Sequence, residues 1–321
     1  MWINLFLFIV GFLFLIKGAD VFVDGSVSIA RKLGMSTFVI GLTVVAFGTS
    51  APELIISVLA SFNNSSEIAL GNIIGTNITN TLLILGATAM MSPLVVKKNT
   101  INKEIPFSLL AIFAIFFMVN DVFLDGYAQN YLTRIDGLVL LLFFCIFIYY
   151  TFGMAKKDQG IFDRDDVPKE AGVFKSLVLV LLGLVGIFLG GEWIVSGAVY
   201  FAGTFGISET FIGLTVVAIG TSLPELATSL MAAKKGNADM AVGGVIGSNI
   251  FNLFWVLGCS SIINPISFDS QLNTDIMMLI SMTILLLFLV FYGKKNMLAK
   301  MEGMIMIMLY LAYIIFLSIR G

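Results

Sequence analysis

The chain has 321 residues and is too apolar for a soluble domain: 59% of its residues are hydrophobic, 12% are charged, and the mean hydropathy is +1.02 at a formal net charge of −2. A soluble domain carries roughly a quarter charged residues, so this composition excludes a soluble globular protein and indicates a polytopic membrane protein. The chain has no histidine, which removes the commonest proton shuttle and a common metal ligand.

Ten segments are long and apolar enough to cross a bilayer, which takes about 20 residues. Polar residues, glycine and proline divide the chain into predicted spans at 2–30, 36–61, 67–92, 104–120, 134–153, 173–203, 208–233, 239–263, 274–293 and 300–319. The first span shows neither a basic region before it nor a cleavage site of small residues, so we interpret it as a retained helix. The sequence therefore predicts an all-α polytopic membrane protein with ten transmembrane helices.

Lysine and arginine are divided unevenly between the connections. With the N-terminus outside, 15 of the 18 basic residues fall in the inside connections, and the outside keeps only Arg134 and Arg320. Basic residues concentrate on the cytoplasmic side of membrane proteins. The sequence therefore predicts a cell-membrane protein with both termini outside and the 154–172 loop inside, whose acidic run of Asp163, Asp165 and Asp166 we interpret as a solvated linker.

The chain contains an internal repeat. A single shift, which carries Gly41 onto Gly213, places 41–86 on 213–258 without a gap, and about half of the aligned positions are identical. This repeat shift also places the first span on the sixth, so each half holds five spans, and an odd number inverts the second half in the membrane. We therefore expect two inverted five-helix repeats, 1–153 and 173–321, joined by the cytoplasmic loop 154–172, as in many secondary transporters.

A carboxylate motif stands in the second predicted span and again in the seventh. Its copies read VVAFGTSAPELIIS, from Val44 to Ser57, and VVAIGTSLPELATS, from Val216 to Ser229. A carboxylate at the centre of a spanning helix costs on the order of 2.5–3.5 kcal/mol, which a purely structural side chain does not require. Two such glutamates, Glu53 and Glu225, predict a shared binding site near the middle of the membrane.

Each glutamate follows a proline that interrupts the helix. Pro52 cannot donate a hydrogen bond to the Gly48 carbonyl, and Pro224 cannot donate one to the Gly220 carbonyl. The helix is therefore predicted to open at both places. Backbone carbonyls freed at this depth must be buried or line a wet cavity.

Further oxygen donors are predicted on the same helix faces. Threonine precedes each glutamate by four residues, and the following span of each half adds a hydroxyl and, four residues later, an amide: Thr49, Thr76 and Asn80 in the first half, and Thr221, Ser248 and Asn252 in the second. An all-oxygen set with two negative charges suits a hard cation, and calcium better than magnesium. Zinc or copper would favour imidazole or thiolate ligands.

Other polar residues in the spans receive a structural interpretation. Asn77 and Asn249 lie off the face of the hydroxyl and amide ligands, so we expect them to form hydrogen bonds between helices. Asp20 and Glu192 are equivalent under the repeat shift. We interpret both as carboxylates solvated towards the ends of the first and sixth spans.

At these residues the chain resembles the calcium/cation antiporter superfamily, and within it the sodium/calcium exchanger branch of the prokaryotic, potassium-independent type. The resemblance covers nearly the whole chain and rests on GTSAPE and GTSLPE together with GNIIGTNITN and GGVIGSNIFN. It implies ten helices in two inverted halves. Spans two, three, seven and eight would form the ion-binding core, and spans one and six would slide across it.

The resemblance also implies the ligands of each ion. Calcium would be held by Glu53 and Glu225 with the backbone carbonyls of Thr49 and Thr221. One sodium site would use the Ala46 carbonyl, Thr49, Thr76 and Glu225, and the other the Ala218 carbonyl, Thr221, Ser248 and Glu53. Asn80 and Asn252 would line the middle, and an amide at Asn252, where potassium-dependent exchangers have aspartate, implies potassium independence.

The predicted function is secondary antiport of sodium against calcium by alternating access. Calcium and sodium are then the partners, in a lipid membrane, with no cofactor, nucleic acid or obligate protein partner and no enzymatic activity. A proton/calcium antiporter with the same glutamates stays open and would be driven by a pH gradient without sodium. A passive cation channel is the other alternative and would give sustained single-channel currents.

Overall fold

The computed structural model describes residues 2–63, 67–124, 126, 128–157, 172–204, 218–292 and 296–320. Among these residues eight continuous helices are long and apolar enough to cross a membrane, and one bent pair of helices forms a further span. The predicted polytopic helical fold is confirmed. The start of the seventh predicted span and most of the 154–172 loop, with its acidic run, lie outside the described residues.

The elements of the first half are, in chain order, α1 (Trp2–Leu33), α2 (Thr37–Ile40), η1 (Gly41–Val45), α3 (Ala46–Thr49), α4 (Ala51–Phe62), α5 (Glu67–Thr79), η2 (Asn80–Ile84), α6 (Leu85–Met91), β1 (Leu94–Val95), η3 (Thr100–Glu104), α7 (Ile105–Met118), α8 (Asp121–Leu124), β2 (Tyr131–Leu132) and α9 (Arg134–Lys157). The segments marked η are π-helical turns.

The elements of the second half are α10 (Val173–Thr204), α12 (Ala218–Thr221), α13 (Leu223–Lys234), α14 (Ala238–Ile250), η6 (Phe251–Val256), α15 (Leu257–Ile263), β3 (Ile266–Ser267), α16 (Leu272–Tyr292), β4 (Met297–Leu298) and α17 (Lys300–Arg320). Several of them match first-half elements under the repeat shift: α13 corresponds to α4, α14 to α5, and β3 to β1.

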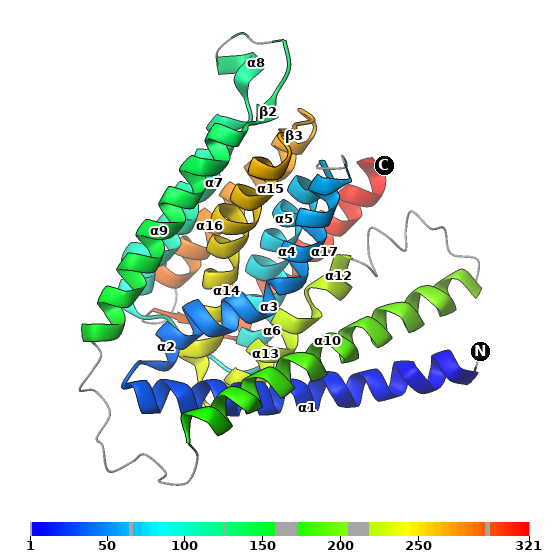
Figure 1. The fold of residues 1–321 in the computed structure, drawn as a ribbon, viewed down its shortest axis with the longest axis vertical. Coiled ribbons are helices and arrows are strands. Elements are labelled where there is room, and N and C mark those ends of the chain that lie inside the picture. The colour runs from blue at the N-terminus through cyan, green and yellow to red at the C-terminus, as the bar shows by residue number, and fades with distance from the viewer. Residues whose placement is uncertain are drawn as a thin grey trace.

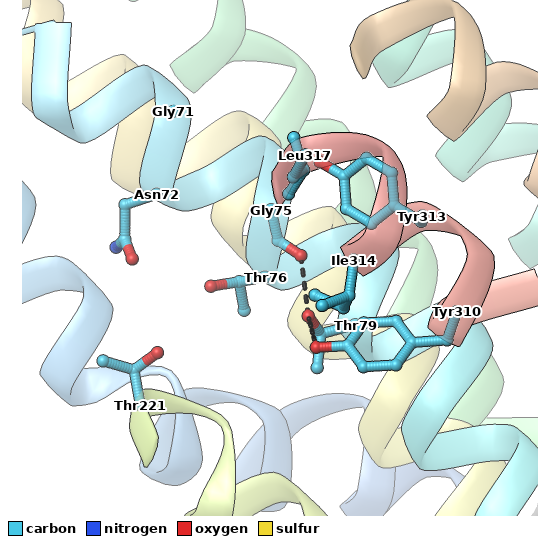
Figure 2. A pocket seen from close by; sticks show the side chains of 10 residues that line it. All are labelled: Gly71, Asn72, Gly75, Thr76, Thr79, Thr221, Tyr310, Tyr313, Ile314 and Leu317. Atoms are coloured by element: carbon cyan, nitrogen blue, oxygen red, sulfur yellow. Dashed lines mark hydrogen bonds between the residues drawn. The ribbon is translucent and has the colours of Figure 1, made fainter. Parts of the chain in front are cut away.

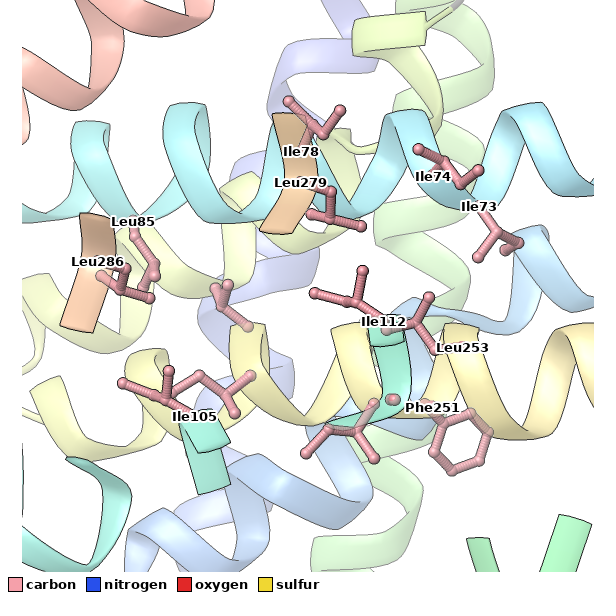
Figure 3. Close-up of a cluster of buried hydrophobic side chains, with 14 of the residues drawn as sticks. Ile73, Ile74, Ile78, Leu85, Ile105, Ile112, Phe251, Leu253, Leu279 and Leu286 are labelled. Carbon is pink, nitrogen blue, oxygen red and sulfur yellow. The ribbon is translucent and has the colours of Figure 1, made fainter. Parts of the chain in front are cut away.

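The third and eighth spans form the centre of the molecule. Ala238–Ile263 is 94% buried and Ala69–Met91 is 78% buried, whereas the spans of α9 and α17 are 22% buried. Branched and aromatic side chains from α5, η6, α7 and α16 pack between these central helices, as Figure 3 shows for Ile73, Ile112, Phe251 and Leu279. The buried centre therefore belongs to the spans that the sequence assigns to ion binding.

Short antiparallel strand pairs join distant helix connections. Leu94 of β1 pairs with Leu298 of β4, and Leu132 of β2 pairs with Ile266 of β3. The first pair joins the segment after the third span to the segment before the tenth span. The second pair joins the segment before the fifth span to the segment after the eighth span. The peripheral helices are thereby fixed to the centre at their ends.

The first and sixth spans lie side by side along one flank, at a steep angle to the rest of the bundle (Figure 1). Glycines recur at every seventh position along the contact, at Gly11, Gly18 and Gly25 of α1 and at Gly183, Gly190 and Gly197 of α10. A Cβ atom at Gly18 would lie 2.6 Å from the Ile187 backbone nitrogen, and one at Gly190 would lie 2.4 Å from that of Leu15. The two backbones therefore touch directly, and we call this contact the α1–α10 interface.

The two helix breaks occur where the sequence predicts them. Thr37–Thr49 and Ala51–Phe62 meet at an angle of 45°. Ser50 at the joint has φ −82° and ψ 5°, and Ser222 between α12 and α13 has φ −90° and ψ 3°. Proline near the start of the following helix removes the donor that a continuous helix would need there. Both halves therefore break in the same conformation, immediately before the two glutamates.

One end of the α1–α10 pair is held to the central helices by an ion-pair cluster. Lys235, directly after α13, places its Nζ atom 2.7 Å from Asp20 Oδ1 and 2.6 Å from Asp24 Oδ1, and also donates to the Asp20 carbonyl. Partial burial of Lys235 lowers the pKa of its ammonium, but the hydrogen bonds to Asp20 and Asp24 outweigh burial and raise the pKa overall. The lysine therefore stays charged at physiological pH.

Candidate cation site

The two glutamates lie at the centre of the bundle. Glu53 has no exposed surface and Glu225 is 2% exposed. Their helices pack on the two central spans, α4 against α5 and α13 against α14. Glu225 lies close enough to Glu53 for their charges to interact, beside the hydroxyls of Thr49 and Ser50. The sequence predicted this convergence of one carboxylate from each half.

The four carboxylate oxygens are buried without a hydrogen-bond partner among the described residues. A buried charged group without compensation is strongly unfavourable, so such groups are normally paired or bind a metal ion. The unpaired carboxylate oxygens of Glu53 and Glu225 therefore form a candidate cation-binding site.

Asparagine side chains from the central spans join these spans and leave oxygen atoms free. Asn80 Nδ2 donates to Asn249 Oδ1 at 3.0 Å, Asn252 Nδ2 donates to Asn77 Oδ1 at 3.3 Å, and Asn249 Nδ2 donates to Thr81 Oγ1 at 3.0 Å. The helix–helix role predicted for Asn77 and Asn249 is confirmed. Asn80 Oδ1 and Asn252 Oδ1 are buried and have no partner among the described residues, so both amides present an acceptor only.

Both candidate amides stand at π-helical turns. Asn80 begins η2 and Asn252 is the second residue of η6. A π-turn interrupts the regular i→i−4 hydrogen bonds of a helix and often occurs at functional sites. The wider turn is a local feature that periodicity in the sequence does not reveal.

Hydroxyl groups of the two halves lie near one another at the site. Thr49 Oγ1 lies 3.4 Å from Ser248 Oγ. Thr76 and Thr221 line a cavity of about 100 Å³ together with Asn72 and Tyr310 (Figure 2). Ala46 is fully buried in α3, and Ala218 is the first residue of α12.

The grouping of sodium ligands expected from the sequence, Thr49 with Thr76 and Thr221 with Ser248, stays a prediction. Thr49 lies beside Ser248 because α14 packs closely against the first half: a Cβ at Gly247 would lie 2.8 Å from the Leu42 carbonyl oxygen and from Ala46 Cβ. Small residues in the eighth span thus allow the second span, from the other half, to pack closely against it. The spacing of these small residues is visible in the sequence, but it does not identify the helix that packs against them.

Two site residues were missed by the sequence prediction. Ser50 and Ser222 are 1% and 2% exposed, and neither hydroxyl has a partner among the described residues. Both stand at the helix breaks, directly after the site threonines. The signal was present, because serine is part of the repeated GTS in both copies of the motif.

The donor set fits a hard cation. It combines two carboxylates, two amide oxygens and several hydroxyls, all oxygen atoms, in a buried position. Calcium takes six to eight oxygen ligands of these kinds, and nitrogen or sulfur ligands, which softer metals prefer, are not part of this set. The same oxygen atoms also suit sodium.

Replacing Asn249 by alanine is expected to destabilise the centre without touching the carboxylates. The change leaves the Asn80 amide without its acceptor and removes a bond to Thr81, and each orphaned buried group costs about 1–3 kcal/mol. The melting temperature of the detergent-solubilised protein should fall by roughly 4–8 °C, as measured by scanning fluorimetry. Asn99→Ala, at an exposed position, is the control, and an equal effect of both changes would contradict the role of this network.

Comparisons with known proteins agree with this arrangement. The family model described as "Sodium/calcium exchanger protein" matches residues 3–153 and 175–319. The chain is 32% identical to the sodium/calcium exchanger MaX1 of Methanosarcina acetivorans, with 98% of each chain covered. It is 37% identical to the membrane protein MJ0091 of Methanocaldococcus jannaschii, with 95% of this chain and 94% of the relative covered.

A solved structure of the sodium-calcium exchanger NCX_Mj superimposes with a TM-score of 0.81 at 36% identity, covering 97% of both chains. The family model matches once in each half, and its two matches together span most of the sequence. On these matches and on the paired, broken helices that carry Glu53 and Glu225, the chain belongs to the sodium/calcium exchanger family.

Proposed function

We propose that this protein exchanges sodium for calcium across the cell membrane, at a site built on Glu53 and Glu225. The observation that carries the proposal is the pair of buried carboxylates whose four oxygens have no partner among the described residues. Family membership and the similarity to NCX_Mj support the same ions. The protein then acts as a transporter and not as an enzyme.

In the calcium-loaded form, Glu53 and Glu225 bind one calcium ion together with the backbone carbonyls of Thr49 and Thr221. Asn80 and Asn252 line the middle of the site with their free oxygens. Two negative charges balance one divalent cation, so the loaded centre carries little net charge. This neutralisation lowers the barrier to burying the site.

The sodium sites flank the calcium position. One uses the Ala46 carbonyl, Thr49 and Thr76 with Glu225, and the other uses the Ala218 carbonyl, Thr221 and Ser248 with Glu53. The burial of the Thr49, Thr76 and Ser248 hydroxyls beside the two carboxylates supports them as ligands. Sodium and calcium compete because both need the same carboxylates.

Alternating access follows from the two inverted halves, 1–153 and 173–321, around the fixed centre. The α1–α10 pair moves relative to the central helices and opens the site to one side at a time. The distribution of basic residues supports an orientation with both termini outside and the 154–172 loop inside. In this orientation the Lys235 ion-pair cluster lies at the cytoplasmic end.

Radiolabelled calcium flux into proteoliposomes tests the proposal. Gradients of sodium, potassium and protons are imposed one at a time, with equal ionic strength on both sides. An outward sodium gradient is expected to drive calcium uptake, and potassium and proton gradients are not. Uptake driven by protons alone would make the protein a proton/calcium antiporter, and calcium movement without any gradient coupling would indicate a channel.

A further inference from the structure

A large cavity is lined by α10, α4 and the broken seventh span. Its volume is about 650 Å³, and its lining includes Pro52 and Ile55 of α4 and Thr221 and Pro224 of the broken seventh span. Pro52 and Pro224 directly precede Glu53 and Glu225. We call this cavity the vestibule, because it lies next to the candidate site and includes the site residue Thr221 in its lining.

Glu192 of α10 is the charged residue among the described residues that line the vestibule. Its side chain is exposed and forms no hydrogen bond or ion pair with any other described residue. It lies within the apolar span Val173–Phe201, where an ionised carboxylate facing lipid would be costly. A cavity of this volume has room for water molecules that would solvate the carboxylate, which accounts for the position of Glu192 beside the vestibule.

The equivalent carboxylate on α1 has different surroundings. Asp20 matches Glu192 under the repeat shift and is bound by Lys235. The α1 residues Ala19 and Val23, which match vestibule residues of α10, have no exposed surface and pack in a cluster with Ala232 of α13. This side of the molecule is closed, and its carboxylate is neutralised by a lysine.

The vestibule side has no equivalent lysine. The position matching Lys235 is Asn63, which carries no charge, and Ser196 stands where α1 has Asp24. Ile55 and Leu59 of α4 are 58% and 55% exposed, whereas the matching residues of α13 pack against α1. Among the described residues that line the vestibule, no basic side chain therefore compensates the carboxylate of Glu192.

We propose that Glu192 is an entry carboxylate, a positioning residue that concentrates cations in the vestibule and passes them to the site without binding them in the transported state. The proposal rests on the proposed exchange at Glu53 and Glu225. A fixed negative charge in a cavity with apolar walls raises the local concentration of cations, by factors of roughly 10 or more. Attraction scales with ionic charge, so Glu192 favours calcium over sodium on entry.

The test compares wild-type protein with Glu192→Gln in proteoliposomes whose orientation is determined from the protease accessibility of a C-terminal tag. Initial rates of calcium uptake are measured against calcium concentration at low and at high ionic strength. For calcium arriving from the vestibule side at low ionic strength, the variant should show a KM raised about three- to tenfold at unchanged maximal rate. High salt should abolish the difference, and Glu192→Asp should restore the low KM.

Asp121→Asn, a change of the same charge at a partly exposed carboxylate outside the vestibule, serves as the control and should leave the KM unchanged. A KM for Glu192→Gln equal to that of the wild type at low salt would overturn the proposal, as would an equal change for calcium arriving from the opposite side. If the wild-type protein shows no sodium-driven calcium uptake, the proposed function fails. If it shows normal exchange and the variant is indistinguishable from it, only the entry role fails.

Discussion

Replacement of Glu53 or Glu225 by glutamine is expected to lower sodium-driven calcium uptake about 100-fold or more. Each change removes one of the two buried negative charges that balance the divalent cation in the proposed site, and leaves one positive charge of the bound ion uncompensated. Removal of one partner from a buried charge pair costs about 3–5 kcal/mol, and each 1.4 kcal/mol is a factor of ten in binding. The measurement is radiolabelled calcium uptake into proteoliposomes that hold equal amounts of folded protein.

Glu302→Gln is the matched control, because Glu302 accepts a hydrogen bond from the Ala299 backbone at the start of α17, away from the site. Glutamine keeps that acceptor, so uptake should stay normal. Calcium binding by the purified variants, measured by calorimetry, separates loss of the site from loss of movement. Normal transport by both glutamate variants would rule out the site as described.

A bulkier residue at Gly190 is expected to disable transport through the α1–α10 interface. The Cβ of an alanine would lie 2.4 Å from the Leu15 nitrogen and 2.7 Å from the Gly11 carbonyl, both of them backbone atoms. Overpacking of this kind costs about 1–3 kcal/mol. Gly190→Ala should therefore lower the melting temperature and the uptake rate, and Gly190→Leu should abolish uptake, since it forces the two helices apart.

Gly153→Ala in α9 is the control for this change. Apart from its chain neighbours and the backbone of its own helix, no described atom lies within 4 Å of a Cβ at Gly153, and replacement of glycine by alanine within a helix is stabilising by about 0.5–1 kcal/mol. The two alanine substitutions should therefore shift the melting temperature in opposite directions. A Gly190→Ala variant as stable and active as Gly153→Ala would show that the close contact does not matter.

The helical architecture and the heart of the site could be predicted from the sequence because each has a strong chemical signature. Hydrophobic length determines spans, and proline removes a backbone donor wherever it stands. The breaks at Ser50 and Ser222 follow from such local rules, and the convergence of Glu53 with Glu225 was inferred from the repeat of their motif in two halves. Because the motif occurs twice, the two membrane glutamates are not explained as an isolated chance occurrence.

Features that depend on contacts between distant helices could not be predicted in the same way. The contact of Thr49 with Ser248 depends on which helix packs against the small residues of α14, and the spacing of those residues alone does not identify that helix. The α1–α10 interface had a visible signal, glycine at every seventh position in both spans, which the prediction did not use. Glu192 was assigned to interfacial solvation, because only the folded molecule places the vestibule beside it.

The glycine contact between α1 and α10 bears on how ions would be kept from leaking across the membrane. Since the two backbones touch at several glycines along the contact, we expect the two helices to move together as one rigid unit. In the proposed exchange, a displacement of this pair that opens the site at one end would close it against the central helices at the other end. Such a movement would leave no continuous path across the membrane, so ions would cross in coupled turnovers and not as a sustained current.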